Sequence, residues 1–561
     1  MHRRFVNVLA VVATVWSFSS VASESQQYQN PILHGGFPDP SICHDGEQFL
    51  LVNSSFEWFP GLPVHSSNDL VNWTLIGNAL DRPEQVQSAV NLVDVQSEGG
   101  IHAPSIRCHQ GRYYIVTTNV YLPPEPGAHA QMVNFVLSAD DPAGPWSDPV
   151  VIDGAVGIDP DILFGSDGRL WYVGNQAPDN PSYPGEGEIW LQELDPTTFQ
   201  LKGEKHLLWR GACGGTWAEG PHLYEVDGRY YLLIAEGGTS FEHAVMIAVS
   251  DDITGPYRSN PRNPILTSRH LSYDNWVNST GHGDLIRLPD NRWYMVALGI
   301  QNKVNRASNM GRETFLLPVT WEREPHWWLD DPVLWPVVSP DTGRVEPSYR
   351  APYGATPDTP KHWVADFSLS DLGPEWLHRR ASKPAYSVDV DREQLVLSLN
   401  QSWLRQRAPS GFIGLRQQTQ NFVAETTLEF EGDVGAAGLA LVQKDDHWVR
   451  IGVVNEGSGT WVKVQYQPGI KEGRPAPAAI TLGQVSIPLD KKVSLRLESS
   501  AAGYEFFVKQ QDWEPVATLP ADALLSRGYT GAVVGPFGHG ESASASSGVA
   551  RFSDFRIEWS R

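Results

Sequence analysis

The chain has 561 residues, too many for one hydrophobic core, so two or three domains are expected. It has a globular composition, with 41% hydrophobic and 19% charged residues, and its 51 glycines, 42 prolines and 21 tryptophans favour short strands joined by turns. The formal net charge of −23 repels phosphate backbones, which argues against a nucleic-acid partner and fits an acidic secreted protein with a neutral ligand.

Residues 1–23 have the features of a signal peptide. His2, Arg3 and Arg4 give a basic start, which is followed by the apolar run FVNVLAVVATVWSF and the small residues of VAS. We expect cleavage after Ser23 and a secreted protein, extracellular or, in a bacterium, periplasmic. The alternative is a membrane anchor, but the run is short for a bilayer span. No later stretch is long and apolar enough to cross a bilayer, so no membrane partner is expected.

A hairpin pattern then recurs five times along the first half of the chain. Each copy has a short apolar strand, a polar turn that usually ends in glycine, and an aromatic-rich strand. The copies are DPSICHDGEQFLLVNSS from Asp39, APSIRCHQGRYYIVTTN from Ala103, DPDILFGSDGRLWYVGN from Asp159, GPHLYEVDGRYYLLIAEG from Gly220 and GDLIRLPDNRWYMVALG from Gly283. Steps of 64, 56, 61 and 63 residues with almost no helical pattern predict a five-bladed β-propeller over 28–345; a β-sandwich array is the alternative.

In a propeller, the first strand of each blade lines the central channel, and the residue before it faces the axis at one end. These positions hold Asp39, the His102–Ala103 pair, Asp159, Glu219 and His282. Carboxylates gathered at a narrow axis repel one another, which folding alone does not favour. Each residue taken singly is also a plausible turn former, but the set together indicates a functional site.

The chemistry of such a set is that of glycoside hydrolysis. One carboxylic acid protonates the leaving oxygen, a carboxylate activates water or attacks directly, and a third carboxylate tunes their proton affinities. The sequence contains no dinucleotide fingerprint, no phosphate-binding loop, no nucleophile-elbow serine and no local metal-ligand spacing, so no cofactor is expected to be required.

After residue 345 the hairpin pattern is lost. Residues 346–361, rich in proline and turn formers, are expected to form a linker, and residues 362–561 contain eight or more alternating strands, which predict a β-sandwich. The predicted fold is therefore all-β, a propeller followed by a sandwich. The sandwich taken alone is also compatible with a carbohydrate-binding module.

Three cysteines are present, Cys43, Cys108 and Cys213, an odd number without metal-ligand spacing. Cys43 and Cys108 occupy nearly matching places in the repeat, which permits a disulfide. Buried free thiols are nevertheless the expectation.

The chain resembles family 43 glycoside hydrolases, in particular β-xylosidases with a C-terminal concanavalin-like β-sandwich. The resemblance runs from NPIL at Asn30 almost to the end and rests on FPDPSIC, SSFEWFPGLPVHSSNDLVNW, APSIRCHQG, GIDPDI, AEGPHLY, AEGGTSFEHAV, GHGDLI and GRETFLLPVTW. The family fold is a five-bladed propeller, in agreement with the repeat.

The resemblance implies a role for each of the three carboxylates. Asp39 would be the general base that activates water, Glu219 the general acid, and Asp159 the residue that raises the pKa of the acid and orients it. Such enzymes invert the anomeric centre, so base and acid should lie about 6.5–9.5 Å apart.

The resemblance also implies residues around the sugar. Arg312 would contact its hydroxyls, with an ion pair to Glu313 as the alternative. Phe56 would form part of the pocket wall or pack in the core, and Thr239 would lie close by. His282 would hold a water molecule or a calcium ion at the axis, or be an ordinary buried histidine.

The sequence departs from the family pattern at several positions. His102 replaces an aromatic residue before AP, so the subsite of the terminal sugar is shaped or hydrated differently. Asp161, two residues deeper in the strand, competes with Asp159 for the tuning role, and Asp159 is favoured by the repeat register. In the sandwich stretch YTGAVVGPFGHG, which would send a loop to the pocket, Val533 stands where an aromatic is usual, with Phe537 nearby.

The predicted activity is exo-acting, inverting hydrolysis that releases terminal β-D-xylose from xylo-oligosaccharides or arabinose-decorated xylan fragments. Within the family the alternative is an α-L-arabinofuranosidase or a bifunctional enzyme. A retaining fructan hydrolase is more distant, because its Asn-Asp-Pro-Asn opening is missing. A non-catalytic secreted carbohydrate-binding protein is the alternative outside enzymes.

Overall fold

The fold is described from a computed structural model. It describes residues 26–560 except 213, 325–331, 355–361, 381–385, 400–402, 405–406, 409, 433–434, 457–458, 471–474, 476, 489–491, 526–528 and 541–547. The expected signal peptide and Cys213 lie outside the described residues.

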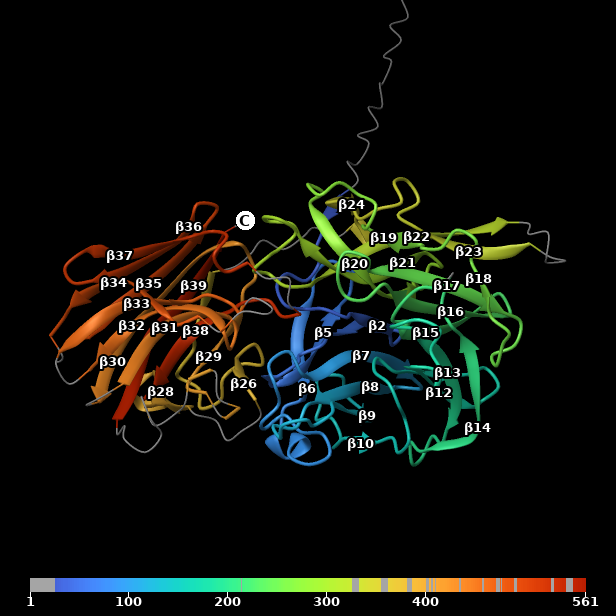
Figure 1. Ribbon diagram of the computed structural model, residues 1–561, viewed down its shortest axis with the longest axis horizontal. Coiled ribbons are helices and arrows are strands. Elements are labelled where there is room, and N and C mark those ends of the chain that lie inside the picture. The colour runs from blue at the N-terminus through green and yellow to red at the C-terminus, as the bar shows by residue number, and fades with distance from the viewer. Residues whose placement is uncertain are drawn as a thin grey trace, which may run out of the picture.

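The chain forms a five-bladed β-propeller followed by a β-sandwich, which confirms the predicted fold class (Figure 1). Each blade is one antiparallel sheet whose strands follow in chain order from the axis outwards. Blade 1 comprises β2 (Ser41–His44), β3 (Phe49–Val52), β5 (Gly61–Ser67) and β6 (Thr74–Leu80); blade 2 comprises β7 (Gly100–His109), β8 (Arg112–Tyr121), β9 (Gln131–Ala139) and β10 (Val150–Val151). Blade 3 comprises β11 (Asp161–Phe164), β12 (Leu170–Gln176), β13 (Glu188–Leu194) and β14 (Leu201–Trp209).

The fourth sheet contains one extra short strand. Blade 4 comprises β15 (Glu219–Val226), β16 (Arg229–Glu236), β17 (Ala244–Ser250), β18 (Arg258–Ser259) and β19 (Leu266–Thr267), both β18 and β19 pairing with β17. Blade 5 comprises β20 (Val277–Arg287), β21 (Trp293–Gln301), β22 (Glu313–Glu324) and β23 (Val333–Val338).

The middle strands are apolar on both faces because each blade is covered by a neighbour on either side. The residues FLLV of β3 and AVMIAVS of β17 are buried throughout. Five clusters of apolar side chains each join one blade to the next, and the last closes the ring between Leu51 of blade 1 and Val296 of blade 5. The blades are therefore held chiefly by hydrophobic burial, and their inner strands have fixed places around one axis.

A short two-stranded sheet ties the two ends of the propeller segment together. β1 (Gln27–Gln29) pairs antiparallel with β24 (Ser348–Arg350), which is followed by the 3₁₀ turn η2 (Pro352–Gly354). The segment expected to be a linker thus begins with a strand that is bound to the propeller. Another 3₁₀ turn in this domain is η1 (Pro83–Val86).

The sandwich consists of two sheets with eight strands each, and their inner faces share one apolar cluster. The first sheet contains β25 (His362–Val364), β27 (Tyr386–Asp389), β28 (Gln394–Ser398), β30 (Asn421–Gly432), β35 (Val493–Ser500), β36 (Gly503–Lys509), β37 (Trp513–Pro520) and β39 (Gly548–Ser560). The second contains β26 (Leu377–Arg379), β29 (Ile413–Arg416), β31 (Gly435–Lys444), β32 (His447–Asn455), β33 (Thr460–Gln467), β34 (Ile480–Ser486), β38 (Val533–His539) and, from the propeller segment, β4 (Trp58–Phe59). The 3₁₀ turn η3 (Val390–Arg392) joins β27 to β28.

The two domains share a sheet, a buried ion pair and a buried hydrogen bond. Strand β4 leaves blade 1 and pairs with β26 of the sandwich. Next to it, Arg379 and Glu57 form a fully buried salt bridge of 2.7 Å. The Arg380 Nε donates to the carbonyl of Val95 at 2.8 Å. Breaking a buried pair on one side leaves an uncompensated charge, so this interface holds the domains in one arrangement.

A disulfide joins Cys43 of β2 to Cys108 of β7, across neighbouring blades. The expectation of free thiols at these two positions is therefore wrong. The two cysteines occupy matching ends of adjacent inner strands, and this places their sulfurs together. Separately, no helix among the described residues is long and apolar enough to cross a membrane.

Candidate active site

The axial ends of the inner strands share an unusual backbone conformation. Positive φ angles occur at Asp39 (50°), Ala103 (35°), Asp159 (55°), Gly220 (56°) and His282 (46°). Left-handed backbone costs about 1–3 kcal/mol at a residue other than glycine and is typical of functional sites. The position that matches Asp39 in blade 4 is thus Gly220, and Glu219 lies one residue earlier.

Gly220 is required at its position by the approach of a neighbouring ring. A Cβ atom on Gly220 would lie 3.0 Å from the His282 imidazole, closer than side chains normally pack. The absence of a side chain lets blade 5 come close to blade 4 directly beside Glu219.

Asp39 is a buried carboxylate beside a guanidinium, an imidazole and a hydroxyl group. Its Oδ2 accepts a hydrogen bond from the Ser54 hydroxyl at 2.6 Å, and its Oδ1 lies 3.8 Å from both Arg312 Nη1 and His282 Nδ1. Burial alone would raise the pKa of Asp39, but His282, Arg312 and the Ser54 hydrogen bond outweigh it and lower that pKa. Asp39 is therefore ionised at neutral pH and suits the role of a base.

Glu219 has the opposite electrostatic character. Burial raises the pKa of Glu219 to about 7. The positive charge of Arg312 opposes this rise, and the negative charge of Asp39 adds to it. It begins β15, where Glu219 faces Ala235 of β16. A carboxyl group that keeps its proton up to neutral pH suits the role of a general acid.

Asp159 lies close to both of these carboxyls. Burial, followed by the charges of Glu219 and Asp39, raises its pKa well above the ordinary value. Its backbone N–H donates to the Thr118 hydroxyl at 3.2 Å. The three side chains therefore face one space, in which the pKa of Asp39 is lowered while those of Glu219 and Asp159 are raised.

Arg312 is a buried guanidinium, 3% exposed, with few protein partners. Its Nε has no hydrogen-bond partner among the described residues, and its nearest ionic contact is the one to Asp39. Glu313 is engaged elsewhere, by Gly35 N–H at 3.1 Å and Gln301 Nε2 at 2.7 Å, so the alternative of an Arg312–Glu313 pair is wrong. The free donors of Arg312 are suited to bind hydroxyl groups.

Three rings form a wall beside Arg312. Phe56, held to β7 by mutual hydrogen bonds with Ile101, packs edge-on against His102 with centroids 4.9 Å apart. Tyr529 lies 5.8 Å from Phe56 and 4.3 Å beneath the Arg312 guanidinium. Phe56 and His102 are thus brought together, and His102 occupies the wall where the family has an aromatic side chain.

Tyr529 belongs to the sandwich domain and was missed by sequence reasoning. Val533 and Phe537 of the same stretch were the expected positions, but Val533 is buried in β38 and Phe537 packs with Trp58 inside the sandwich. The Tyr529 N–H donates to Glu98 at 3.1 Å, and Lys444 pairs with the same carboxylate at 2.9 Å. The aromatic residue before the Thr-Gly of this stretch is the signal that could have identified it.

A buried polar network lies one layer further along the axis. Arg107 binds both Asp161 and Asp284, the latter at 3.0 Å, and His222 Nδ1 lies 3.0 Å from Asp161. The Tyr224 hydroxyl donates to Asp284 at 2.6 Å. Asp161 is thus committed to Arg107 and does not compete with Asp159.

The described residues around His282 do not fit a calcium ion. Burial lowers the pKa of His282 to about 4, which leaves a neutral imidazole. Calcium takes about six to eight oxygen ligands, whereas no group of three or more His, Cys, Asp or Glu in the described part of the chain is arranged to hold a metal. The two carboxylates of the adjoining polar network, Asp161 and Asp284, already have Arg107 as their cation.

Thr239 is half-buried in the loop between β16 and β17. Beside that loop, His243 is buried, and burial lowers its pKa to about 3, with Arg312 and His282 adding to the effect. Sequence reasoning did not single out His243, although it lies in the same AEGGTSFEHAV stretch as Thr239.

Comparisons with known proteins agree with this geometry. A sequence model described as "Glycosyl hydrolases family 43" matches residues 28–327, more than half of the chain. This chain belongs to glycosyl hydrolase family 43. A second model, "Beta xylosidase C-terminal Concanavalin A-like domain", matches residues 364–558.

Family 43 relatives cover most of the chain. A "Xylosidase/arabinosidase" of Butyrivibrio fibrisolvens is 38% identical over 78% of this chain and 81% of its own. A "Non-reducing end alpha-L-arabinofuranosidase" of Bacteroides ovatus is 33% identical over 99% of both chains. Among solved structures, a xylan beta-1,4-xylosidase from Bacillus halodurans is similar with a TM-score of 0.84 and 27% identity, covering 95% of this chain and 100% of that one. The protein is thus a glycoside hydrolase, as the sequence predicted.

Proposed function

We propose that this protein is an exo-acting, inverting glycoside hydrolase that releases terminal β-D-xylose from xylo-oligosaccharides. The observation that carries the proposal is the separation of proton affinities in one buried space: the pKa of Asp39 is lowered, while that of Glu219 is raised to about 7. A base and an acid are thus present together near neutral pH.

In the proposed reaction, a water molecule attacks the anomeric carbon while the bond to the leaving oxygen breaks. The Asp39 carboxylate takes the proton of that water, and the Glu219 carboxylic acid gives its proton to the leaving oxygen. Asp159 supports the acid, because two interacting carboxyls raise each other's pKa. Arg312 donates to hydroxyls of the terminal sugar, and Phe56, His102 and Tyr529 enclose it.

Release of the terminal residue alone is supported by the enclosure of the site. The loop that carries Tyr529 comes from the sandwich and is tied to Glu98 of the propeller. We infer that this loop closes the site on the side of Arg312, against which the Tyr529 ring lies, so that one chain end enters rather than a continuous polysaccharide.

An α-L-arabinofuranosidase, alone or combined with xylosidase activity, is the second candidate. The observation that favours it is His102, whose polar ring replaces an aromatic one in the wall around the terminal sugar. Two of the relatives are also named for action on arabinosides.

The test is hydrolysis of aryl β-D-xyloside and aryl α-L-arabinofuranoside side by side, with proton NMR of the first sugar anomer released. We expect faster turnover of the xyloside and α-xylose as the first product. Preferential turnover of the arabinofuranoside would establish the second candidate, and a first product of retained configuration would refute direct attack by water. A lectin-like binder would turn over neither substrate.

We also propose that the protein is exported, with residues 1–23 as its signal peptide. The disulfide between Cys43 and Cys108 supports this, since disulfides persist in oxidising compartments. N-terminal sequencing of the secreted protein tests the proposal; an N-terminus at residue 1 in the cell fraction would contradict it.

A further inference from the structure

A second cavity lies between blades 4 and 5, at the end of the inner strands opposite the carboxylates. Strand β15 begins with Glu219 at the catalytic end and ends with Val226 in this cavity. At about 3.3 Å per residue, the strand separates the two sites by about 20 Å. The cavity measures about 810 Å³, within the range of about 300–1,000 Å³ typical of small-molecule sites.

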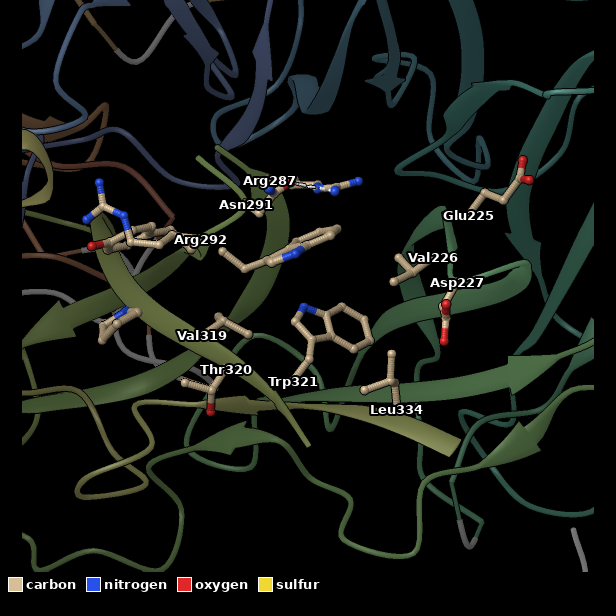
Figure 2. A pocket seen from close by; sticks show the side chains of 13 residues that line it. Glu225, Val226, Asp227, Arg287, Asn291, Arg292, Val319, Thr320, Trp321 and Leu334 are labelled. Atoms are coloured by element: carbon tan, nitrogen blue, oxygen red, sulfur yellow. Dashed lines mark hydrogen bonds between the residues drawn. The ribbon is translucent and has the colours of Figure 1, made fainter. Parts of the chain in front are cut away.

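We propose that this groove is a second saccharide-binding site, which holds an uncharged segment of the xylan chain remote from the catalytic carboxyls. The identity of the saccharide rests on the proposed function. The site itself is argued from the side chains that line the groove (Figure 2).

Two tryptophans form the floor and one wall of the groove. Trp293 begins β21 and Trp321 lies on the neighbouring β22; their rings meet edge to face with centroids 5.2 Å apart. On its other side Trp321 packs edge-on against Tyr231 at 5.0 Å. Both tryptophans are half-buried, so they are braced from behind while part of each ring lines the groove. Rigid ring surfaces of this kind bind the apolar faces of sugars with little loss of side-chain entropy.

The rim of the groove carries polar groups of both kinds. Figure 2 shows Arg287 and Asn291 above the Trp321 ring, and Val226 and Asp227 to its right. The Asn291 Oδ1 accepts from Arg287 Nε at 3.1 Å, which leaves the amide nitrogen of Asn291 without a partner among the described residues. Donors and acceptors around an aromatic floor are the equipment needed for a polyhydroxylated ligand.

The charges of the rim balance, which decides the class of ligand. Arg287 and Arg292 face Glu225 and Asp227 across the groove, two positive groups against two negative ones. Two of these groups have a further partner of opposite charge: Asp290 lies 2.6 Å from Arg292 and Arg323 lies 2.7 Å from Asp227, so three positive groups stand against three negative ones. The chain as a whole carries a net charge of −23. A phosphorylated or acidic ligand would gain nothing from this rim, whereas a neutral oligosaccharide avoids the cost of burying an unpaired charge.

The test is native affinity electrophoresis of the full-length protein in gels with and without soluble neutral xylan. We expect xylan to retard the wild type, and the double variant Trp293→Ala/Trp321→Ala to bind it at least about tenfold more weakly, the loss typical of aromatic anchors. Trp513→Ala is the matched control, because Trp513 is a half-buried sandwich tryptophan that stacks on Arg496 away from the groove. Its retardation should equal that of the wild type.

A single substitution tests the groove if the double variant does not fold. Asn291 has a φ of 69°, which glycine adopts freely, so Asn291→Gly removes the amide while keeping the turn. It should reduce retardation in part and leave hydrolysis of a small aryl xyloside unchanged. Absence of retardation in the wild type, or equal retardation in the double variant, would overturn the proposal. Aryl xyloside hydrolysis reports only on the catalytic site, whereas retardation in the xylan gel reports on the groove. Loss of the first without the second, or the reverse, therefore shows which of the two proposals has failed.

Discussion

The raised pKa of Glu219 leads to a specific pH dependence. If Glu219 must hold a proton to protonate the leaving oxygen, kcat/KM for xylobiose should fall above pH about 7, by tenfold for each further pH unit. The acidic side of the profile should be set by Asp39, whose pKa lies below the ordinary carboxyl value.

The fraction of Glu219 that is protonated at a given pH follows from the shift of its pKa. With a pKa of about 7, about 90% of Glu219 holds its proton at pH 6; at the ordinary value of 4.5 only about 3% would do so. Burial in the propeller thus increases the active fraction at pH 6 about 30-fold.

The assay compares xylobiose, whose leaving group needs the proton, with an activated dinitrophenyl β-xyloside, whose leaving group does not. Glu219→Gln should lose about 10²- to 10⁴-fold in kcat/KM on xylobiose, much less on the activated substrate, and its alkaline decline should vanish.

Glu236→Gln is the control, because burial raises the pKa of Glu236 to about 7 as well, outside the catalytic group. That variant should keep the decline. The reasoning would be refuted by an alkaline limit near pH 4.5 in the wild type, or by a decline that persists in Glu219→Gln.

Three further predictions concern single side chains. Arg312→Lys should lower kcat/KM for aryl xyloside at least about 10- to 100-fold, the equivalent of one lost hydrogen bond from a charged group, and an unchanged value would exclude contact with the sugar. Tyr529→Ala should raise KM about tenfold with little change in melting temperature, whereas Tyr529→Phe should match the wild type because its observed contacts use the ring and the backbone N–H. The folded-state pKa of Glu236 is raised, so the stability it contributes is full below pH 4.5 and is lost as the pH rises through about 7. Between pH 4 and pH 9, the free energy of unfolding measured in urea titrations should therefore fall by about 3 kcal/mol less in Glu236→Gln than in the wild type. An equal fall in both proteins would contradict this.

The propeller and its catalytic end were predictable because the hairpin pattern is local and repeated. Asp39, Asp159 and Glu219 are found at strand starts that the repeat identifies, and the blades lie in the expected order. The repeat register is confirmed in blade 4, where Gly220 adopts the shared positive φ, and is one residue off in blade 5, where His282 rather than Gly283 adopts it. The absence of a side chain on Gly220 is a packing requirement that no periodicity reports.

Features that depend on contacts between distant segments were not predictable in this way. Tyr529 reaches Phe56 across more than 470 residues of sequence, and β4 joins a sheet otherwise built after residue 376. The pairing of Cys43 with Cys108 depends on how two adjacent inner strands face each other. The matching repeat positions permitted that pairing, but composition alone favoured free thiols.

Strand β4 has a consequence for how this enzyme can be taken apart. A gene fragment that ends near residue 345 would encode an incomplete protein, because Trp58 and Phe59 would lose the sheet they pair with and Glu57 would keep a buried charge without Arg379. Domains of multidomain carbohydrate enzymes are routinely exchanged by cutting the chain at the border between them. Here a cut near residue 345 should yield two insoluble halves. The two domains would have to be engineered, and inherited, as one piece.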